Sequence, residues 1–271
     1  MNHETAPHAD PLSPPEIACR IASSAAVRAR ASLSRQFVLA LMAGAFIGAG
    51  ANAFTAALVA APPGGLSRLV GSIAFSMGLV LVVVAGAELF TGNALQVAAC
   101  LTRRLRLDEL LRSWAVVFAG NVVGAVAAAA LVAASGQELL HGGQMGRLMV
   151  SVAAAKLHYT FSQAFLLGVL CNALVCLAVW MATAGRSVVD KVVVIMPPIA
   201  AFVLAGFEHS IANLYFVPLG LLLDGGATPG LTWGTFLWKN LLPVTLGNIV
   251  GGAALVALPY WVAYLRRQDA A

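Results

Sequence analysis

Long apolar blocks alternate with short polar stretches along the whole chain. Several blocks exceed the roughly 20 residues that a helix needs to cross the hydrocarbon core of a bilayer. Read in this way, and with ends set only to within a few residues, the predicted membrane spans are 36–60, 69–101, 110–135, 160–183, 189–223 and 240–264. The pattern therefore predicts an all-α membrane protein with six transmembrane helices.

The second and fifth of these segments are longer than a single crossing requires. Each is interrupted midway by glycine and polar residues, GAELFTGN at 86–93 and GFEHSIAN at 206–213. Two half-helices joined by a non-helical loop fit such a segment better than one continuous helix. We therefore expect helices 2 and 5 to be broken inside the membrane.

The two interruptions share one pattern, G-x-E-x-x-x-x-N. Gly86, Glu88 and Asn93 in the first match residues 206, 208 and 213 in the second at a constant offset of 120. A further motif, GNVVG at 120–124, returns as GNIVG at 247–251. Because each half contains an odd number of spans, the second copy must enter the membrane in the opposite direction. The sequence thus predicts two inverted three-helix repeats.

Lysines and arginines gather on one side of this predicted topology. Of the 16, 12 belong to one side: they lie before span one, between spans two and three, between spans four and five, or after span six. Basic loops face the cytoplasm, so both termini are predicted to be cytoplasmic in an inner membrane. The expected organisation is a cytoplasmic segment with a short amphipathic helix (1–34), a transmembrane domain (35–265) and a cytoplasmic tail (266–271).

Composition supports the membrane assignment. Of the 271 residues, 60% are hydrophobic and 10% are charged, against roughly 25% charged residues in soluble domains. The net charge of +5 is interpreted as a topology signal and as anchoring to anionic lipid, because no nucleic-acid-binding module occurs. The four cysteines have no metal-binding or disulfide spacing, and neither a metal nor a cofactor is expected.

Candidate chemistry lies at the two interruptions. Non-helical backbone at membrane depth is tolerated only where protein packs around it or where it lines a cavity, so the two related breaks are expected to meet near the midplane. Half-helix N-termini present N–H donors and partial positive charge, which suits an anion. His209 begins the second half of span five. A neutral imidazole can donate a hydrogen bond to an anion, and a protonated one can attract the anion and hand it a proton.

Each candidate residue has a structural alternative. His209 could simply bond a neighbouring helix, but the break, the adjacent Glu208 and the lack of another histidine inside a span favour a pore. Glu88 and Glu208 are either proton carriers or carboxylates that accept bonds from helix ends or a basic partner. Lys156 is either an outer charge that attracts anions or an interfacial lysine. Asn172 faces the pore or a helix partner.

Several strings of the sequence resemble the formate/nitrite transporter family over about residues 35–265. They are GAELFTGN, KLHYTF, CNALVCLAVWMA, GRSVVDK, GFEHSIANLYFVPLGLL and NLLPVTLGNIVGG. The resemblance implies an aquaporin-like fold assembled as a homopentamer, in which every protomer has its own pore. KLHYTF and GRSVVDK are more similar to formate channels than to the nitrite or hydrosulfide branches. The connection between spans five and six is shorter than in formate channels.

The same resemblance implies roles for individual residues. It makes His209 the central pore histidine, with Thr91 opposite it and Asn172 lining the pore nearby. It also implies a polar group that polarises the histidine and an apolar constriction. The polar group consists of Lys156, Glu208 and Asn213. The constriction consists of Phe75, Leu79, Leu89 and Phe202.

The predicted function is a channel for small monovalent anions, formate first and nitrite or hydrosulfide as the alternative, in a lipid bilayer and without a nucleic-acid partner. A water or glycerol channel is the nearest different class, but it carries two Asn-Pro-Ala signatures and no Asn-Pro dipeptide occurs here. An intramembrane enzyme is disfavoured, since the chain has neither H-E-x-x-H nor G-x-S-x-G.

Overall fold

The computed structural model describes residues 10–62 and 64–266. Residues 1–9 of the predicted N-terminal segment and 267–271 of the predicted tail lie outside this part. Within it, every regular element is helical. The helices long and apolar enough to cross a membrane are Leu33–Leu58, Gly65–Ala85, Leu107–Ala134, Phe161–Ala184, Val188–Ala205 and Trp233–Leu265. They confirm the predicted all-α class with six spans.

The first half of the chain carries one helix outside the spans and one broken span. Span two stops at Ala85 and resumes at Gly92, which confirms the predicted break. In chain order the elements are α1 (Pro14–Ala29), α2 (Leu33–Leu58), α3 (Gly65–Phe75), α4 (Met77–Ala85), η1 (Gly92–Gln96), α5 (Val97–Leu101) and α6 (Leu107–Ala134).

The second half repeats this plan. Span five stops at Ala205 and resumes at Ser210, so it too is broken as predicted. Its elements are η2 (Gln137–Leu139), α7 (Leu140–Ala155), α8 (Phe161–Ala184), α9 (Val188–Ala205), α10 (Ser210–Asp224), α11 (Trp233–Thr235), η3 (Phe236–Leu241), α12 (Leu242–Gly252), η4 (Ala253–Ala257), α13 (Leu258–Tyr260) and η5 (Trp261–Leu265).

Two features differ from the sequence prediction. Span six begins at Trp233, earlier than the predicted residue 240, because the Thr232 hydroxyl caps the helix by accepting a 3.1 Å bond from the Thr235 N–H. Helix α7 was not predicted at all. Its sequence is too short and too polar for a span, and residues 141–143 at its start have positive φ values.

Equivalent helices pair in the two halves. Helix α2 packs along α6, and α8 packs along α12. Glycines of the GNxVG motifs let the backbones approach, since a Cβ at Gly124 would overlap the carbonyl oxygen of Leu41 and one at Gly251 would overlap that of Val169. Small residues allow such close contact between membrane helices. The repeat seen in the sequence is therefore also a repeat of packing.

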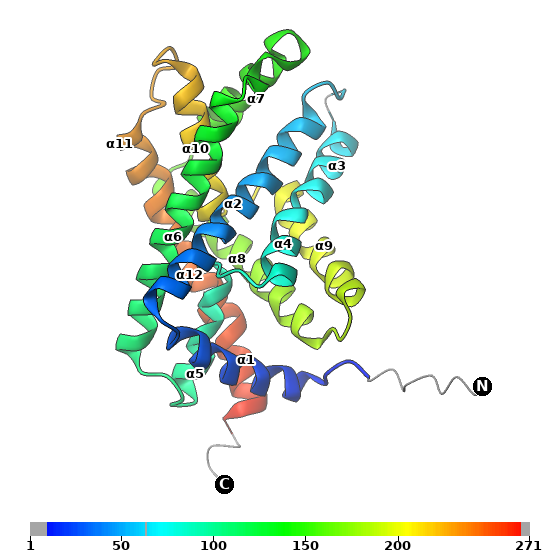
Figure 1. Cartoon of the computed structure of the whole chain (residues 1–271), viewed down its shortest axis with the longest axis vertical. Coiled ribbons are helices and arrows are strands. Elements are labelled where there is room, and N and C mark those ends of the chain that lie inside the picture. The colour runs from blue at the N-terminus through cyan, green and yellow to red at the C-terminus, as the bar shows by residue number, and fades with distance from the viewer. Residues whose placement is uncertain (1–9, 63, 267–271) are drawn as a thin grey trace, which may run out of the picture.

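The two ends of the molecule carry different elements (Figure 1). Helix α1 lies across the lower end of the bundle, beside the last turns of span six, whereas α7 and the end of α10 rise at the upper end. We call the end with α7 the outer side and the end with α1 the inner side.

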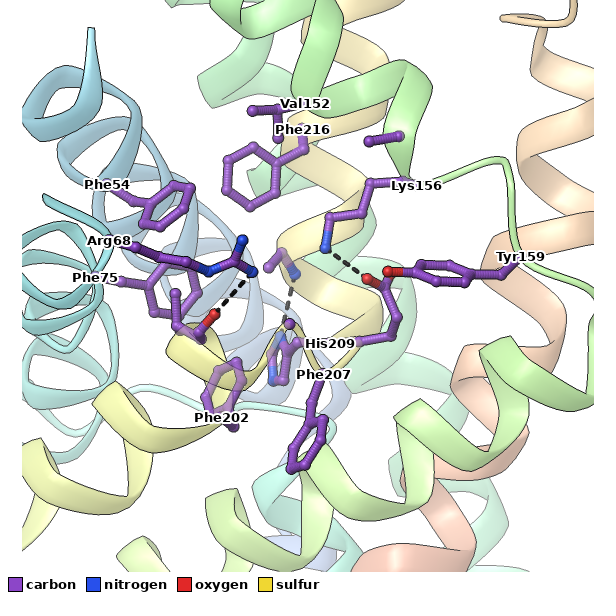
Figure 2. Close-up of a pocket in the computed structure, with 15 residues that line it drawn as sticks. Phe54, Arg68, Phe75, Val152, Lys156, Tyr159, Phe202, Phe207, His209 and Phe216 are labelled. Atoms are coloured by element: carbon purple, nitrogen blue, oxygen red, sulfur yellow. Dashed lines mark hydrogen bonds and ion pairs between the residues drawn. The ribbon is translucent and has the colours of Figure 1, made fainter. Parts of the chain in front are cut away.

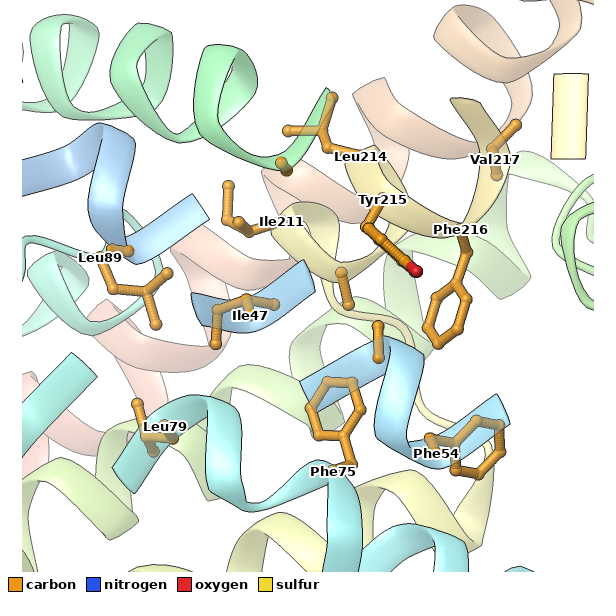
Figure 3. Packing of buried hydrophobic residues seen from close by; sticks show 14 of the residues in the cluster. Ile47, Phe54, Phe75, Leu79, Leu89, Ile211, Leu214, Tyr215, Phe216 and Val217 are labelled. Carbon is orange, nitrogen blue, oxygen red and sulfur yellow. The ribbon is translucent and has the colours of Figure 1, made fainter. Parts of the chain in front are cut away.

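The largest hydrophobic cluster surrounds the two breaks (Figure 3). Rings and aliphatic side chains from α2, from the first half of span two and its loop, and from α10 meet there, including Ile47, Phe75, Leu79 and Leu89. Large apolar side chains are also exposed on the outer faces of the spans, for example Leu131 and Leu166. Such exposure suits contact with lipid rather than water.

Candidate functional site

A glycine with positive φ ends the first half of each broken span. Helix α4 stops at Gly86 (φ 81°) and α9 stops at Gly206 (φ 77°). This left-handed conformation closes a helix and costs glycine little because it has no Cβ. Each glycine is followed by a short loop that leads its glutamate into the protein, and these loops bring Thr91 and His209 together.

His209 is the N-cap residue of α10. Its Nδ1 accepts a 3.1 Å hydrogen bond from the Ala212 N–H, and its Nε2 lies 2.9 Å from Thr91 Oγ1. Since Nδ1 accepts, the proton of the neutral ring resides on Nε2. The ring therefore donates towards Thr91, across the junction between the two breaks, and only 3% of His209 is exposed.

Two asparagines of the GNxVG motifs hold the loops in place. Asn121 Oδ1 accepts from the Phe90 N–H, and its Nδ2 donates to the Glu88 carbonyl. Asn248 repeats these bonds with the Ser210 N–H and the Glu208 carbonyl. The motif is visible in the sequence, but the role of these side chains is not. They satisfy backbone groups that the breaks would otherwise leave unpaired in a nonpolar setting.

Glu208 is at the centre of a polar network on the outer side. Its carboxylate accepts bonds from Lys156 Nζ (2.7 Å), Asn213 Nδ2 (2.8 Å) and Asn240 Nδ2 (3.1 Å). The structure therefore brings Lys156, Glu208 and Asn213 together. The hydrogen bonds of the His209 ring go instead to Ala212 and Thr91. Asn240 was missed, although a lone asparagine at the start of an apolar helix is a usable signal.

A corresponding network lies on the inner side. Glu88 Oε2 accepts a 2.8 Å bond from Asn93 Nδ2 and lies 3.7 Å from the guanidinium of Arg28 in α1. Nothing in the sequence connects Arg28 with this site. The repeat offset could not have found it, because the position equivalent to Lys156 in the first half is Gln36.

The four predicted constriction residues surround one small space. The rings of Phe75 and Phe202 meet edge to face with centroids 5.7 Å apart. With Leu79, Leu89 and His209 they line a central cavity of about 10 Å³, which is about the least that holds one water.

Larger cavities open on both sides of this centre, and Figure 2 shows the outer one. The outer cavity, of about 210 Å³, shares Phe75, Phe202 and His209 with the central one. The inner cavity, of about 180 Å³, shares Leu79 and Leu89 with it. The shared residues place the three cavities in a row, with the narrowest in the middle.

Asn172 lies behind the Thr91 loop. Its Nδ2 donates to the carbonyl oxygens of Thr91 (3.0 Å) and Asn248 (2.6 Å). Cys176 Sγ lies 3.4 Å from the same Thr91 carbonyl. Both side chains thus fix the backbone that carries the Thr91 hydroxyl. In the described part of the chain, no group of three or more His, Cys, Asp or Glu side chains could hold a metal ion.

Comparison with known proteins agrees with this geometry. The model of the family described as formate/nitrite transporter matches residues 15–262. The chain belongs to the formate/nitrite transporter family. Among relatives of this family, the formate channel FocA of Escherichia coli K12 is 42% identical over 251 residues, which cover 87% of this chain and 88% of FocA. The probable formate transporter of Methanothermobacter thermautotrophicus is 41% identical, with 94% and 97% covered.

Solved structures of the family have the same fold. A pentameric formate channel with formate bound has a TM-score of 0.78 and 39% identity, covering 86% of this chain and 98% of that one. An FNT family ion channel has a TM-score of 0.83 and 32% identity, with 92% and 98% covered. The chain therefore has the aquaporin-like fold of this family and is a multi-pass membrane protein.

Proposed function

We propose that the chain forms a channel for small monovalent anions, with formate as the favoured substrate. The observation that carries this proposal is the 2.9 Å contact between Thr91 Oγ1 and His209 Nε2 at the narrowest of three cavities in a row. Two polar groups converge there on an otherwise apolar space, so a small polar solute exchanges its water for their hydrogen bonds. The formate channels among the relatives support the choice of substrate.

Passage would proceed in three steps. The anion gathers in the outer cavity beside Lys156 and loses water between the rings of Phe75 and Phe202. It then takes the place of Thr91 as the partner of the His209 Nε2–H, while the Thr91 hydroxyl turns to donate to it. It leaves past Leu79 and Leu89. The solute crosses either as an anion held by these donors or as the neutral acid, for which His209 must first take up a proton from water and then pass it on.

The same proposal covers assembly and placement. We propose a homopentamer with one pore in each protomer, supported by the pentameric state named for the solved formate channel. An inner membrane with both termini in the cytoplasm is supported by the lysines and arginines on the α1 side. The protein would be a transport protein without an enzymatic reaction, in keeping with relatives that are channels and transporters.

Flux through the purified protein in liposomes tests the function. We expect formate to cross fastest, nitrite and hydrosulfide more slowly, and glycerol not at all. The change His209→Phe removes the ring donor at similar volume, so it should lower formate flux at least about tenfold, the cost of one lost hydrogen bond, or abolish its pH dependence. His158→Phe, at an exposed histidine, is the matched control.

Two outcomes would contradict the proposal. Glycerol flux without formate flux would make the protein a neutral-solute channel. Formate flux that is the same in the wild type and in His209→Phe at every pH would remove His209 from the mechanism.

A further inference from the structure

The outer cavity is lined by two cationic side chains, and one of them is already neutralised. Lys156 Nζ lies 2.7 Å from Glu208 Oε1, and the Glu208 side chain is 1% exposed. Opposite charges at this distance largely cancel for an anion several ångströms away. Lys156 can therefore contact an anion, but it adds little net charge to the cavity.

Arg68 is the second cation. It lies on α3, and in the part of the chain that the structure describes it forms no ion pair with a carboxylate. Its recorded hydrogen bond is a long one, 3.4 Å from Nη2 to the carbonyl oxygen of Val203 near the end of α9. Figure 2 shows the guanidinium reaching into the cavity from the α3 side, opposite Lys156.

Arg68 lies on the same helix as Phe75, one of the constriction residues. Phe75 follows it by seven residues on the same helix, so both side chains lie on one face, two turns apart. The surrounding surface is aromatic, with Phe54, Phe202 and Phe216 also lining the cavity. Low-polarity walls strengthen the field of a charge that they surround.

We propose that Arg68 supplies the net positive charge that holds small planar oxyanions in the outer cavity, directly above the constriction. The inference rests on the proposed transport function and adds a residue to it. A guanidinium offers five N–H donors in a planar fork that matches a carboxylate. Among the described residues, the only hydrogen bond of the Arg68 guanidinium is the long one to Val203. The anion is then delivered past Phe75 to His209.

The test measures how formate flux saturates when formate is supplied from the outer side. Proteoliposomes with one protein orientation are selected by protease access to an N-terminal tag. Formate flux is measured first at constant ionic strength and then at ionic strengths varied with sodium gluconate. We expect Arg68→Gln to raise the half-saturating formate concentration about fourfold, the effect of one charge at ~5 Å in water. It should also flatten the dependence on ionic strength, while leaving the maximal flux within about twofold.

The chain offers a matched control. Arg147 is also an exposed arginine of the outer side, and its Nη2 likewise lies 3.4 Å from a backbone carbonyl, that of Gly142. It lines a different surface cavity, which also contains Glu138 and Asp224. Arg147→Gln should leave saturation unchanged, and Arg68→Lys should restore part of the lost affinity.

The outcomes separate this inference from the proposed function. If the wild type passes no formate, the proposed function fails. If the wild type passes formate and Arg68→Gln shows the same half-saturation and the same ionic-strength dependence, the role of Arg68 is wrong and the function stands. An equal change in Arg147→Gln would attribute the effect to general surface charge and would also overturn the inference.

Discussion

At the scale of single residues, the orientation of one imidazole ring defines the centre of the site. The N–H of Ala212 binds Nδ1 of His209, which leaves Nε2 to face Thr91. The donor at the centre is thus set by the first turn of α10 and not by a partner side chain. The carbonyl of Thr91 is held in turn by Asn172, so the backbone that carries the hydroxyl opposite the ring is also held in place.

This arrangement predicts that Thr91→Val lowers formate flux about tenfold, because a lost hydrogen bond costs ~1–1.5 kcal/mol. Valine keeps the shape of threonine and leaves the backbone bond to Asn172 in place. Thr91→Ser retains the hydroxyl and should remain within about threefold of the wild type. Stopped-flow measurements in liposomes check both variants. A Thr91→Val protein as fast as the wild type would show that the hydroxyl takes no part.

Several of these residues could be found from the sequence and others could not. His209 and Glu208 were found because ionisable residues inside an apolar segment are costly and rare. Thr91 and Phe75 came only from the family resemblance, since a threonine and a phenylalanine are ordinary in a span. Arg28 was missed because its contact with Glu88 joins two elements that are distant in sequence.

At the scale of elements, the breaks were predictable because the residues that cause them lie at the breaks themselves. A glycine in the left-handed region ends α4 and another ends α9, and glycine within a long apolar segment is a visible signal. Helix α7 was not predictable in this way. Its first turn contains residues with positive φ at 141–143, and its apolar residues are too few to mark a span.

The close pairing of α2 with α6 predicts that a larger residue at the contact lowers the stability of the protein. A methyl group at Gly124 would overlap the Leu41 carbonyl, and overpacking of this kind costs ~1–3 kcal/mol. Gly124→Ala should therefore lower the thermal unfolding midpoint of the detergent-solubilised protein. Gly65→Ala is the control, because no atom lies within 4 Å of its added Cβ. Equal midpoints for the two variants would contradict the packing argument.

The stability of the first turn of α1 is expected to depend on pH. The hydroxyl and N–H of Ser13 donate to Glu16 Oε2 at 2.6 and 2.8 Å, and these bonds lower the pKa of Glu16 below its ordinary value of 4.5. A carboxyl whose folded pKa is lowered stabilises the fold above its unfolded pKa, and this contribution is lost as the pH falls through the folded pKa.

We therefore expect the first turn of α1 to be protected from hydrogen exchange above about pH 4.5 and to lose protection below it. Exchange followed by mass spectrometry and corrected for intrinsic rates measures this. Glu16→Gln should remove the pH dependence in that range. Protection that falls equally in this variant would trace the change to another group.

At the scale of the whole molecule, the two halves place matching carboxylates on opposite sides of the central cavity. Glu208, which is bonded to Asn213, lines the outer cavity, and Glu88 and Asn93 line the inner one. The cations that join them do not follow the repeat, since Lys156 comes from the end of α7 and Arg28 from α1. The repeat could be predicted from the sequence, whereas these additions could only be seen once the chain was folded.

The central cavity of about 10 Å³ has a consequence for the energetics of a cell. A space near the lower limit for one water leaves no room for a file of several waters, along which a proton could hop between the outer and inner cavities. A membrane that carries many copies of this protein would then keep its electrochemical gradient, and solutes would cross one at a time.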